Sequence, residues 1–413
     1  VLLCHGFGDL AGTLGLRTKL RRRTRSEKAL QELPAPSRAA RFRMVLEELG
    51  TTFIKLGQIL SCRHDVFPDE LIREFEKLQD TVPPFSGELA REIVESELGR
   101  PWHEVFRVFD TEPLASASIA QVHRAETIAG EIVAVKVRRP NLQATVETDL
   151  EIMSYLAGLV NRHIEGAAVF QPENMVWEFA RILRREMDMR AEAAHIVRFA
   201  RSFEGDDRLY VPRVYREFTT EKVLVLEYVD GMKVSNLDAF ESAGLDRSVV
   251  AKNGTGIIFK QVFDHGFYHA DPHPGNILVL PDNVICLLDY GMTGILTARN
   301  REHIGDMIIG FARRDEARIT SAFFQMAGYT QLERQERVES DVANFLDSHM
   351  YGQLQDIRIG RLLNELSRLL VTHGIALPFD FFLLTKAVTT IESVGRRLEP
   401  EFDVLEHAQP FAE

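Results

Sequence analysis

Cysteine and long apolar runs are both scarce in this sequence. The 413 residues include only three cysteines, Cys4, Cys62 and Cys286, and no two of them stand at C-x-x-C spacing. This pattern excludes a disulfide framework and a thiolate zinc site, and it favours a reducing, cytosolic compartment. No run of about 18 apolar residues occurs, so we expect no helix that spans a bilayer.

The chain also lacks an excess of positive charge. Its 49 lysines and arginines face 61 aspartates and glutamates, which gives a formal net charge of −12. A nucleic-acid-binding protein needs a broad basic face for the phosphate backbone, so we exclude nucleic acid as a partner. With 45% hydrophobic and 27% charged residues, the composition is typical of a globular protein of two or three domains.

One segment departs from this acidic balance. Residues Arg17 to Lys28, RTKLRRRTRSEK, contain seven basic residues and one acid. Because apolar Phe7, Leu10 and Leu14 precede it, the segment is suited to contact an anionic membrane surface. A solvated terminal arm explains the same charges equally well, and both interpretations stay open.

The spacing of apolar residues predicts an α+β protein with helices at both ends. Residues 38–99 and the residues beyond Ile295 have the three- and four-residue apolar spacing of helices. Between them, short β-branched runs predict strands, of which EIVAVKV at Glu131–Val137 is the clearest. The other elements expected there are helices over about 143–164, 172–203 and 249–266 and a strand over Lys222–Gly231.

The strand EIVAVKV carries one lysine on an apolar face. Alternation gives an all-valine face and a second face with the lysine, namely Val133, Val135 and Val137 against Ile132, Ala134 and Lys136. Burying an ammonium group without a partner costs free energy on the order of several kcal/mol. Lys136 must therefore reach solvent, pair with a carboxylate or bind a phosphate.

A polar loop and a following strand carry the strongest chemical signal. In HADPHPGN, Asp271 and Asn276 are five positions apart, and Asp289 follows thirteen positions later behind an apolar strand. This is the spacing of a kinase catalytic loop and its metal-binding aspartate. Asp271 is then expected to accept the proton of an attacking hydroxyl, while Asn276 and Asp289 bind magnesium.

The same loop permits a second chemical interpretation. His269, Asp271 and His273 alternate, and three such side chains on one face could ligate the metal of a hydrolase. The prolines Pro272 and Pro274 suit a loop better than a strand, and no second histidine pair stands at ligand spacing. We therefore favour the kinase-like interpretation.

Several short motifs together identify a family. They are KLGQ at Lys55–Gln58, ASASIAQVH at Ala115–His123, VAVK at Val133–Lys136, EMD at Glu186–Asp188 with Glu192 after it, HADPHPGN at His269–Asn276 and LLDYG at Leu287–Gly291. With these motifs the chain resembles the UbiB/AarF family of atypical kinases from about Leu49 to Leu398. The resemblance implies a protein-kinase-like two-lobed fold with an N-terminal helical extension and a helix-rich C-lobe.

The resemblance also implies four consecutive blocks of sequence. A basic segment covers 1–37, and a helical extension with the K-x-G-Q motif covers 38–100. A kinase-like N-lobe with inserted helices covers 101–230, and a helical C-lobe covers 231–413.

Further roles for single residues follow from the resemblance alone. Glu192 is expected to pair with Lys136, and both would serve catalysis together with Asp271. Lys55 and Gln58 would lie over the active site, with Lys55 near Glu186 and Asp188. The remaining residues expected to contact the nucleotide are Ala134, Glu227 and Val229 at the strands and hinge, and Ala115, Ser116, Ala117, Ser118, Ile119, Ala120 and Gln121 in the nucleotide loop.

On the residues alone, blander interpretations remain for two of these motifs. The KLGQ segment could be a core-packing helix face, although its mid-helix Gly57 costs about 1 kcal/mol against alanine and needs a reason such as close approach. Glu186, Asp188 and Glu192 could equally form a solvated acidic face.

The sequence departs from ordinary protein kinases in two places. The nucleotide loop has alanines and serines where protein kinases have glycines, and each Cβ keeps the backbone further from a phosphate. Family resemblance therefore suggests a shift from ATP towards ADP. No A-P-E motif follows Gly291, which favours a small-molecule or lipid acceptor over a protein.

These observations predict a protein that binds ATP or ADP with Mg²⁺ and acts as an atypical kinase or ATPase. The family context implies a role in ubiquinone biosynthesis, with isoprenoid lipid or enzymes of that pathway as partners. It also implies a cytoplasmic, peripheral position at the inner membrane. A nucleotide-regulated lipid-binding scaffold with little turnover is the alternative.

Overall fold

The computed structural model describes ten stretches of the chain. These are residues 1, 5, 36–78, 82–164, 166–240, 242–329, 335–349, 358–375, 377–404 and 407–408. The basic segment Arg17 to Lys28 lies outside them. The chain forms two compact units, and each is assembled from separated segments. Unit 1 comprises Val1–Pro84, Ser116–Ala120 and Arg139–Leu183, and unit 2 comprises Phe85–Ala115, Gln121–Arg138 and Arg184–Glu413.

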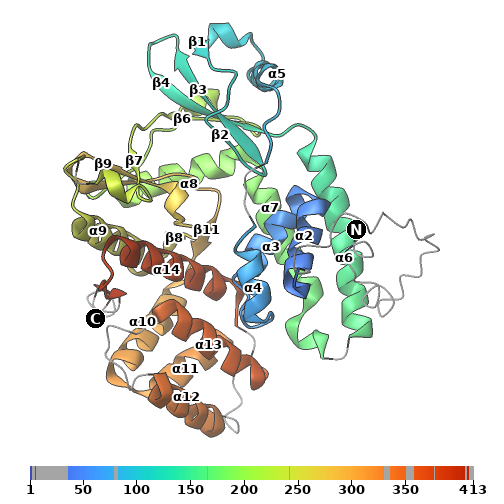
Figure 1. Ribbon diagram of the computed structural model, residues 1–413, viewed down its shortest axis with the longest axis vertical. Coiled ribbons are helices and arrows are strands. Elements are labelled where there is room, and N and C mark those ends of the chain that lie inside the picture. Colours follow the sequence, from blue (N-terminus) through green and yellow to red (C-terminus); the bar gives the residue numbers. More distant parts are fainter. Residues whose placement is uncertain are drawn as a thin grey trace. The chain divides into compact units, whose positions relative to one another are not determined.

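Unit 1 is helical (Figure 1). Its helices are α2 (Arg38–Leu49), α3 (Thr51–Leu60), α4 (Asp69–Phe75), α6 (Leu142–His163) and most of α7 (Pro172–Glu186). Ser37 caps α2 by accepting a hydrogen bond from the Ala40 N–H, and Gly50 separates α2 from α3 with φ of 103°. The predicted helical region before residue 99 is therefore confirmed as a series of short helices.

The helix α3 carries the K-x-G-Q motif and contains a glycine for a packing reason. A Cβ atom at Gly57 would lie 2.2 Å from Leu78 Cδ1 and 2.9 Å from Leu46 Cδ1. Gln58 adds a hydrogen bond from its Nε2 to the Leu78 carbonyl at 3.1 Å. Close approach of the segment after α4 thus explains the unfavourable mid-helix glycine.

The strand-rich part of unit 2 is built on one sheet with strand order β1-β3-β4-β6. Its strands are β1 (Phe106–Phe109), β3 (Ala120–Thr127), β4 (Ile132–Arg138) and β6 (Val223–Glu227), with the short β2 (Ala115–Ser116) paired to β3. β4 and β6 are antiparallel, and Lys136 lies opposite Leu224. The predicted strand over residues 222–231 is thus shorter than expected and ends at Glu227.

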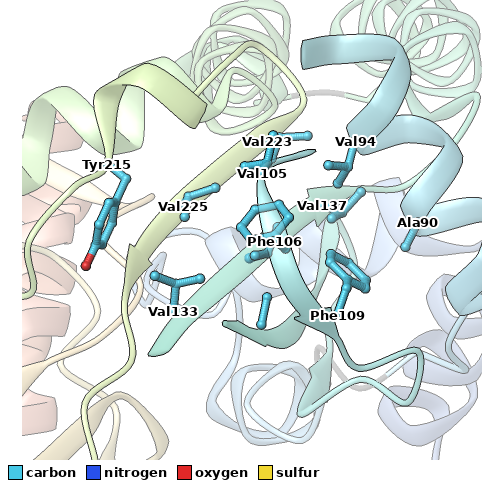
Figure 2. Packing of buried hydrophobic residues seen from close by; sticks show 12 residues of the cluster. Ala90, Val94, Val105, Phe106, Phe109, Val133, Val137, Tyr215, Val223 and Val225 are labelled. Carbon is cyan, nitrogen blue, oxygen red and sulfur yellow. The ribbon is translucent and has the colours of Figure 1, made fainter. Parts of the chain in front are cut away.

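One apolar cluster holds this sheet to the helix α5 (Gly87–Leu98). The three valines of β4 are fully buried and pack with Phe106, Phe109 and the α5 side chains Ala90 and Val94 (Figure 2). The opposite face of β4, with Ala134 and Lys136, is half-buried. The predicted division of the strand into two faces is confirmed, so the core fixes the direction in which Lys136 points.

The predicted helix over 172–203 is two helices. α7 ends at Glu186, and α8 (Met189–Ser202) begins after Asp188. The Asp188 side chain accepts a hydrogen bond from the Arg190 N–H at 3.0 Å and so caps α8. Aspartate competes well for backbone N–H groups at a helix start, which is the physical reason for the break.

Two small sheets of unit 2 carry the polar loop. One has the order β5-β10-β9-β7 and the other pairs β11 with β8. Their strands are β5 (Leu209–Tyr210), β7 (Met232–Lys233), β8 (Phe267–His269), β9 (Ile277–Leu280), β10 (Val284–Leu287) and β11 (Thr293–Ile295). β9 and β10 are antiparallel with Leu287 opposite Ile277, so Asn276 and Leu288 meet at the open end of this pair.

Helices make up the rest of unit 2 (Figure 1). α9 (Arg247–Lys260) is buried on several sides and continues into a π-helical turn at Gln261–His265. α10 (Ala298–Arg313), α11 (Glu316–Met326), α12 (Gln335–His349), α13 (Ile359–Thr372) and α14 (Phe379–Leu398) follow, each packed on the next, and α14 also packs on α9. None of the described helices has both the length and the apolar character needed to cross a membrane.

Candidate functional site

The lysine of β4 is the centre of a charge cluster in unit 2. Its Nζ lies 3.0 Å and 2.9 Å from the two carboxylate oxygens of Glu192 on α8, and 3.1 Å from Asp289 Oδ1 after β10. Lys136 is 17% exposed and Glu192 only 4%, whereas Asp289 is 48% exposed. Three side chains that are up to 153 positions apart therefore meet at one ammonium group.

The electrostatics of this cluster favour a permanently charged lysine. Burial alone would lower the pKa of Lys136, but the carboxylates of Asp289 and Glu192 outweigh burial and hold the pKa above its ordinary value. Burial also raises the pKa of Glu192 to about 7, against the lowering effect of Lys136. The cluster thus presents a fixed positive charge between one buried and one accessible acid.

Asp289 has a backbone conformation that is unusual for a residue with a side chain. Its φ is 54°, in the left-handed region. Its Oδ1 also accepts a hydrogen bond from the Gly291 N–H at 3.3 Å, and a Cβ at Gly291 would lie 3.4 Å from Glu186 Cγ. The turn thus lies within van der Waals distance of the end of α7. Such strained residues occur preferentially at functional sites.

The first histidine of HADPHPGN is a structural residue of the loop. His269 is fully buried, its Nδ1 accepts from the Asp271 N–H at 3.2 Å, and its Nε2 donates to the Leu288 carbonyl at 3.2 Å. Burial lowers the pKa of His269, which keeps the ring neutral as this pattern requires. Both ring nitrogens are used by backbone groups, so His269 cannot ligate a metal.

The second histidine is also engaged locally, because His273 Nδ1 accepts from the Gly275 N–H at 3.2 Å. Within the described residues, no group of three or more histidine, cysteine, aspartate or glutamate side chains is placed to hold a metal ion. The geometry therefore disfavours the metal-hydrolase interpretation of His269, Asp271 and His273.

The donor set at the end of β9 and β10 fits a magnesium ion. Asn276 Nδ2 donates weakly to the Asp271 carbonyl at 3.5 Å, and the Asn276 carbonyl accepts from the Leu288 N–H at 2.8 Å. Asn276 is thereby held beside the residue that precedes Asp289. An amide oxygen and a carboxylate oxygen are hard ligands of the kind that Mg²⁺ prefers, with phosphates and waters completing its shell.

Asp271 has an ionic partner that sequence analysis did not identify. Its Oδ1 lies 3.3 Å from Nζ of Lys386, which is on α14. Asp271 is 33% exposed and Lys386 is 19% exposed. The proposed proton acceptor thus has an ammonium group at ion-pair distance.

The expected hinge residues begin at Glu227, the last residue of β6. The Glu227 N–H donates to the Arg213 carbonyl at 2.8 Å, and its carboxylate accepts from Tyr210 Oη at 2.6 Å and from the Arg213 N–H at 3.1 Å. The Tyr228 N–H donates to the Ile132 carbonyl at 3.1 Å, and Val229 is half-buried. These N–H groups are occupied, which leaves the Glu227 carbonyl and the Val229 N–H as the groups to test for an adenine contact.

The alanine-rich loop Ser116–Ala120 belongs to unit 1, where an arginine holds it. Arg139 donates from Nε to the Ala117 carbonyl at 2.8 Å and from Nη2 to Ser116 Oγ at 2.7 Å, and its N–H donates to the Ile119 carbonyl at 2.9 Å. None of the described residues from 115 to 120 has a positive φ. The loop therefore keeps its shape without glycine.

The last residue expected in this loop, Gln121, has a different environment in unit 2. Its Oε1 accepts from the Phe85 N–H at 3.1 Å, and its Nε2 donates to the Phe85 carbonyl at 3.2 Å and lies 2.8 Å from His123 Nε2. The side chain is fully buried. These partners argue against a nucleotide contact by the Gln121 side chain.

Three other expected site residues are found in structural settings. Lys55 is buried in α3 of unit 1, and the Gln58 amide is bonded to Leu78 in the same unit. The Asp188 carboxylate in unit 2 accepts from Arg190 Nε and Nη2, both at 2.9 Å, and this bond to Arg190 lowers the pKa of Asp188. Their expected roles at the nucleotide stay predictions.

Two residues were missed by sequence reasoning, and only one of them left a signal. Lys386 is the single charged residue between Asp380 and Glu392, in the apolar stretch FFLLTKAVTTI. A lone lysine in an apolar helix raises the same question as Lys136 does in its strand. Arg139 stands in VRRPN next to a second arginine, and nothing in that pattern distinguishes it.

Comparison with known proteins supports a kinase-like family. The profile of the ABC1 atypical kinase-like domain matches residues 77–323, and that of the UbiB helical domain matches residues 342–403. An uncharacterized protein of Synechocystis, sll1770, is 37% identical over 368 residues, or 89% of this chain and 63% of that protein. A probable protein kinase UbiB of Marinobacter nauticus is 35% identical over 92% of this chain and 70% of its own length.

Other relatives give the same result. A probable protein kinase UbiB of Aeromonas salmonicida is 36% identical over 92% of this chain and 70% of its own length. Among solved structures, the complex of Rv3197 with erythromycin from Mycobacterium tuberculosis matches with a TM-score of 0.59 at 22% identity, covering 91% of this chain and 96% of that one. The latter likeness concerns the fold, which is kinase-like, as the sequence predicted.

Proposed function

The chain belongs to the UbiB family of ABC1 atypical kinase-like proteins, and from this we propose that it binds Mg-ATP or Mg-ADP and acts as an atypical kinase or ATPase. The observation that carries the proposal is the contact of Lys136 with both Glu192 and Asp289. A kinase needs the strand lysine paired with a helix glutamate and the metal-binding aspartate beside them. If these residues only packed in the core or formed a solvated acidic face, Lys136, Glu192 and Asp289 would have no reason to meet.

Each residue has a separate role in the proposed reaction. Lys136, oriented by Glu192, contacts the phosphates of the nucleotide. Asn276 and Asp289 hold the magnesium ion, which neutralises the charge of the phosphates when it is bound. Asp271 accepts the proton of the attacking hydroxyl or water as the oxygen bonds to the terminal phosphoryl group, and the bond to the leaving ADP breaks.

Two further regions are proposed to contact the nucleotide, and the loop among them sets the preference between ATP and ADP. We place the adenine edge at the Glu227 carbonyl and the Val229 N–H, beside Ala134 on the half-buried face of β4. The alanine-rich loop from Ala115 to Ala120 is proposed to contact the phosphates. Because its Cβ atoms limit close approach to the terminal phosphate, we propose that ADP competes well with ATP.

The proposed acceptor is a small molecule or a lipid, in support of ubiquinone biosynthesis. This follows from the absence of an A-P-E motif after Gly291 in the sequence and from the relatives named probable protein kinase UbiB. We further propose a peripheral contact with an anionic membrane through Arg17 to Lys28. Anionic liposomes should then raise the ATPase rate of the full chain, and deletion of that segment should remove the increase.

The deciding experiment is nucleotide binding with and without magnesium. Mg-ADP and Mg-ATP should raise the melting temperature of the wild type, and Asp289→Asn should lose the magnesium-dependent part of that shift. If nucleotide raised the melting temperature of the wild type equally with and without magnesium, that result would contradict the proposed metal site. Magnesium-dependent binding without any ATP turnover would instead favour the nucleotide-regulated scaffold.

A further inference from the structure

The helical region after the kinase-like core contributes a lysine to the site. Lys386 lies on α14 and within the part of the chain that matches the UbiB helical domain. Its Nζ is 3.3 Å from Asp271 Oδ1. A residue 115 positions after the loop (386 − 271) thus reaches the proposed proton acceptor.

The position of Lys386 is set by the packing of α14. On either side of it, Thr385 and Ala387 are buried, and Thr385 Oγ1 bonds to the Phe381 carbonyl at 3.0 Å. At the start of the helix, Tyr268 Oη donates to the Asp380 carbonyl at 3.0 Å. Tyr268 belongs to β8, which leads directly into the Asp271 loop. The helix and the loop are therefore held to each other six residues before Lys386 (386 − 380), nearly two helical turns from the ion pair.

Charge balance gives this lysine a chemical task. Phosphoryl transfer places negative charge on the equatorial oxygens of the moving group, and cations are needed there. Lys136 already has two carboxylate partners, and the loop from His269 to Asn276 contains no lysine or arginine. Lys386 lies beside Asp271, the residue proposed to meet the acceptor hydroxyl. It therefore lies on the side from which that hydroxyl attacks the phosphoryl group.

We propose that Lys386 is a second catalytic cation, which contacts the transferred phosphoryl group and keeps Asp271 in position. The inference rests on the proposed function. An ion pair with partly exposed partners contributes little to stability, so stability alone gives little reason for a lysine at this position, beside the buried residues Thr385 and Ala387. Contact with the terminal phosphoryl group gives such a reason.

The test compares Lys386→Met and Lys386→Arg with the wild type in the full chain. The probes are Mg-ADP, which lacks the terminal phosphoryl group, Mg-ATP, and Mg-ADP with aluminium fluoride, which imitates the transferring group. Lys386→Met should bind Mg-ADP within about threefold of the wild type, but bind the aluminium fluoride complex and turn over ATP about 100-fold less well, the usual effect of losing one such stabilising group. Lys386→Arg should recover much of the loss.

A matched control is available in the same protein. Lys260 on α9 forms an ion pair with Asp206 at 2.7 Å, and Lys260→Met also removes a lysine from a lysine–aspartate pair. It should leave the ratio of Mg-ADP to aluminium fluoride affinity unchanged. If Lys386→Met also leaves that ratio and the turnover unchanged, while the wild type is active, Lys386 is structural and the inference fails alone.

The remaining outcomes are also decisive. A wild type that binds neither nucleotide overturns the proposed function and this inference together. A wild type that binds nucleotide without turnover still tests the contact, because Lys386→Met must then weaken Mg-ATP more than Mg-ADP. Equal weakening of the two nucleotides would contradict a contact with the terminal phosphoryl group.

Discussion

Two lysines approach the acidic side chains of this site from regions of different construction. Lys136 stands on a sheet strand whose other face is fully buried, and it has carboxylates at 2.9 Å and 3.1 Å. Lys386 stands on a helix and pairs with the carboxylate of Asp271 at 3.3 Å, and that aspartate is a third exposed. The first lysine is held by two acids, one of them buried, so its geometry is set before any ligand arrives.

The second lysine is more weakly held, and this difference is informative. Coulomb attraction between partly exposed partners is weakened, because water and salt screen it. An incoming phosphoryl group can therefore compete for Lys386 at small cost, whereas removing Lys136 from Glu192 would leave a carboxylate that is only 4% exposed. The strand region is suited to fixed positioning and the helix region to a contact that forms during the reaction.

The largest effect on stability is expected from breaking the strand pair. Lys136→Met leaves Glu192 buried without its cation, and we expect unfolding free energy to fall by about 3–5 kcal/mol. Adding Glu192→Gln should recover more than half of that loss, because the amide is neutral, whereas Glu192, whose pKa burial raises to about 7 even beside Lys136, must take up a proton once the cation is gone. Urea unfolding of the single and double variants measures both changes. If the double variant recovered none of the unfolding free energy, the Lys136–Glu192 pair would not be the source of the loss.

An intermediate effect is expected at the lysine–aspartate pair that serves as a reference. Asp206 is 9% exposed and forms ion pairs with Arg208 and Lys260, both at 2.7 Å. The hydrogen bond from Arg208 lowers the pKa of Asp206. Burial acts in the opposite direction, and the hydrogen bond from Lys260 lowers the pKa further. Asp206→Asn should cost about 2 kcal/mol at pH 7.

The pH dependence of this reference pair has a definite sign. A lowered pKa in the folded state gives stability that is complete above the ordinary aspartate value of about 3.9 and is lost as the pH falls towards the lowered value. The wild type and Asp206→Asn should thus differ at pH 7 and pH 5 and converge as the solution becomes strongly acidic. Unfolding midpoints at a series of pH values test this, and a difference that grows in acid would contradict it.

A smaller effect is expected for the helix pair. A double-mutant cycle of Lys386→Met and Asp271→Asn should give a coupling in folding free energy below about 1 kcal/mol, since both partners are partly exposed. The same variants should reduce turnover strongly, so the separation of the two readouts sharpens the contrast with Lys136. A coupling as large as that of the strand pair would remove the contrast.

The smallest effect concerns the loop that precedes β3. Ala117→Gly should lower stability by about 0.4–1 kcal/mol through the unfolded chain. It should also change the ratio of Mg-ATP to Mg-ADP affinity, because the loop can then approach a phosphate more closely. Calorimetric titration of both nucleotides measures the ratio. An unchanged ratio would contradict the proposal that the loop sets the nucleotide preference.

The sequence predicted the elements near each motif well and their ends less well. Strict alternation in β4 correctly placed Lys136 opposite the valine face, because side-chain direction in a strand is a local property. The single helix expected over 172–203 was wrong, since Asp188 caps a new helix there. The strand expected to reach Gly231 ends at Glu227. Apolar spacing does not register such competition between side chain and backbone.

Motif spacing by itself predicted the chemical character that we propose for this protein. The interval from Asp271 to Asn276 and on to Asp289 lies within one loop and one strand pair, and the register of that pair places Asn276 beside Leu288, the residue before Asp289. The tertiary structure decided the rest, namely that Glu192 is an ion-pair partner and not a solvated acid, that Arg139 holds the alanine loop, and that Lys386 meets Asp271. These contacts join residues that are not neighbours in the chain, and only the packing of helices and strands within each unit determines such distances.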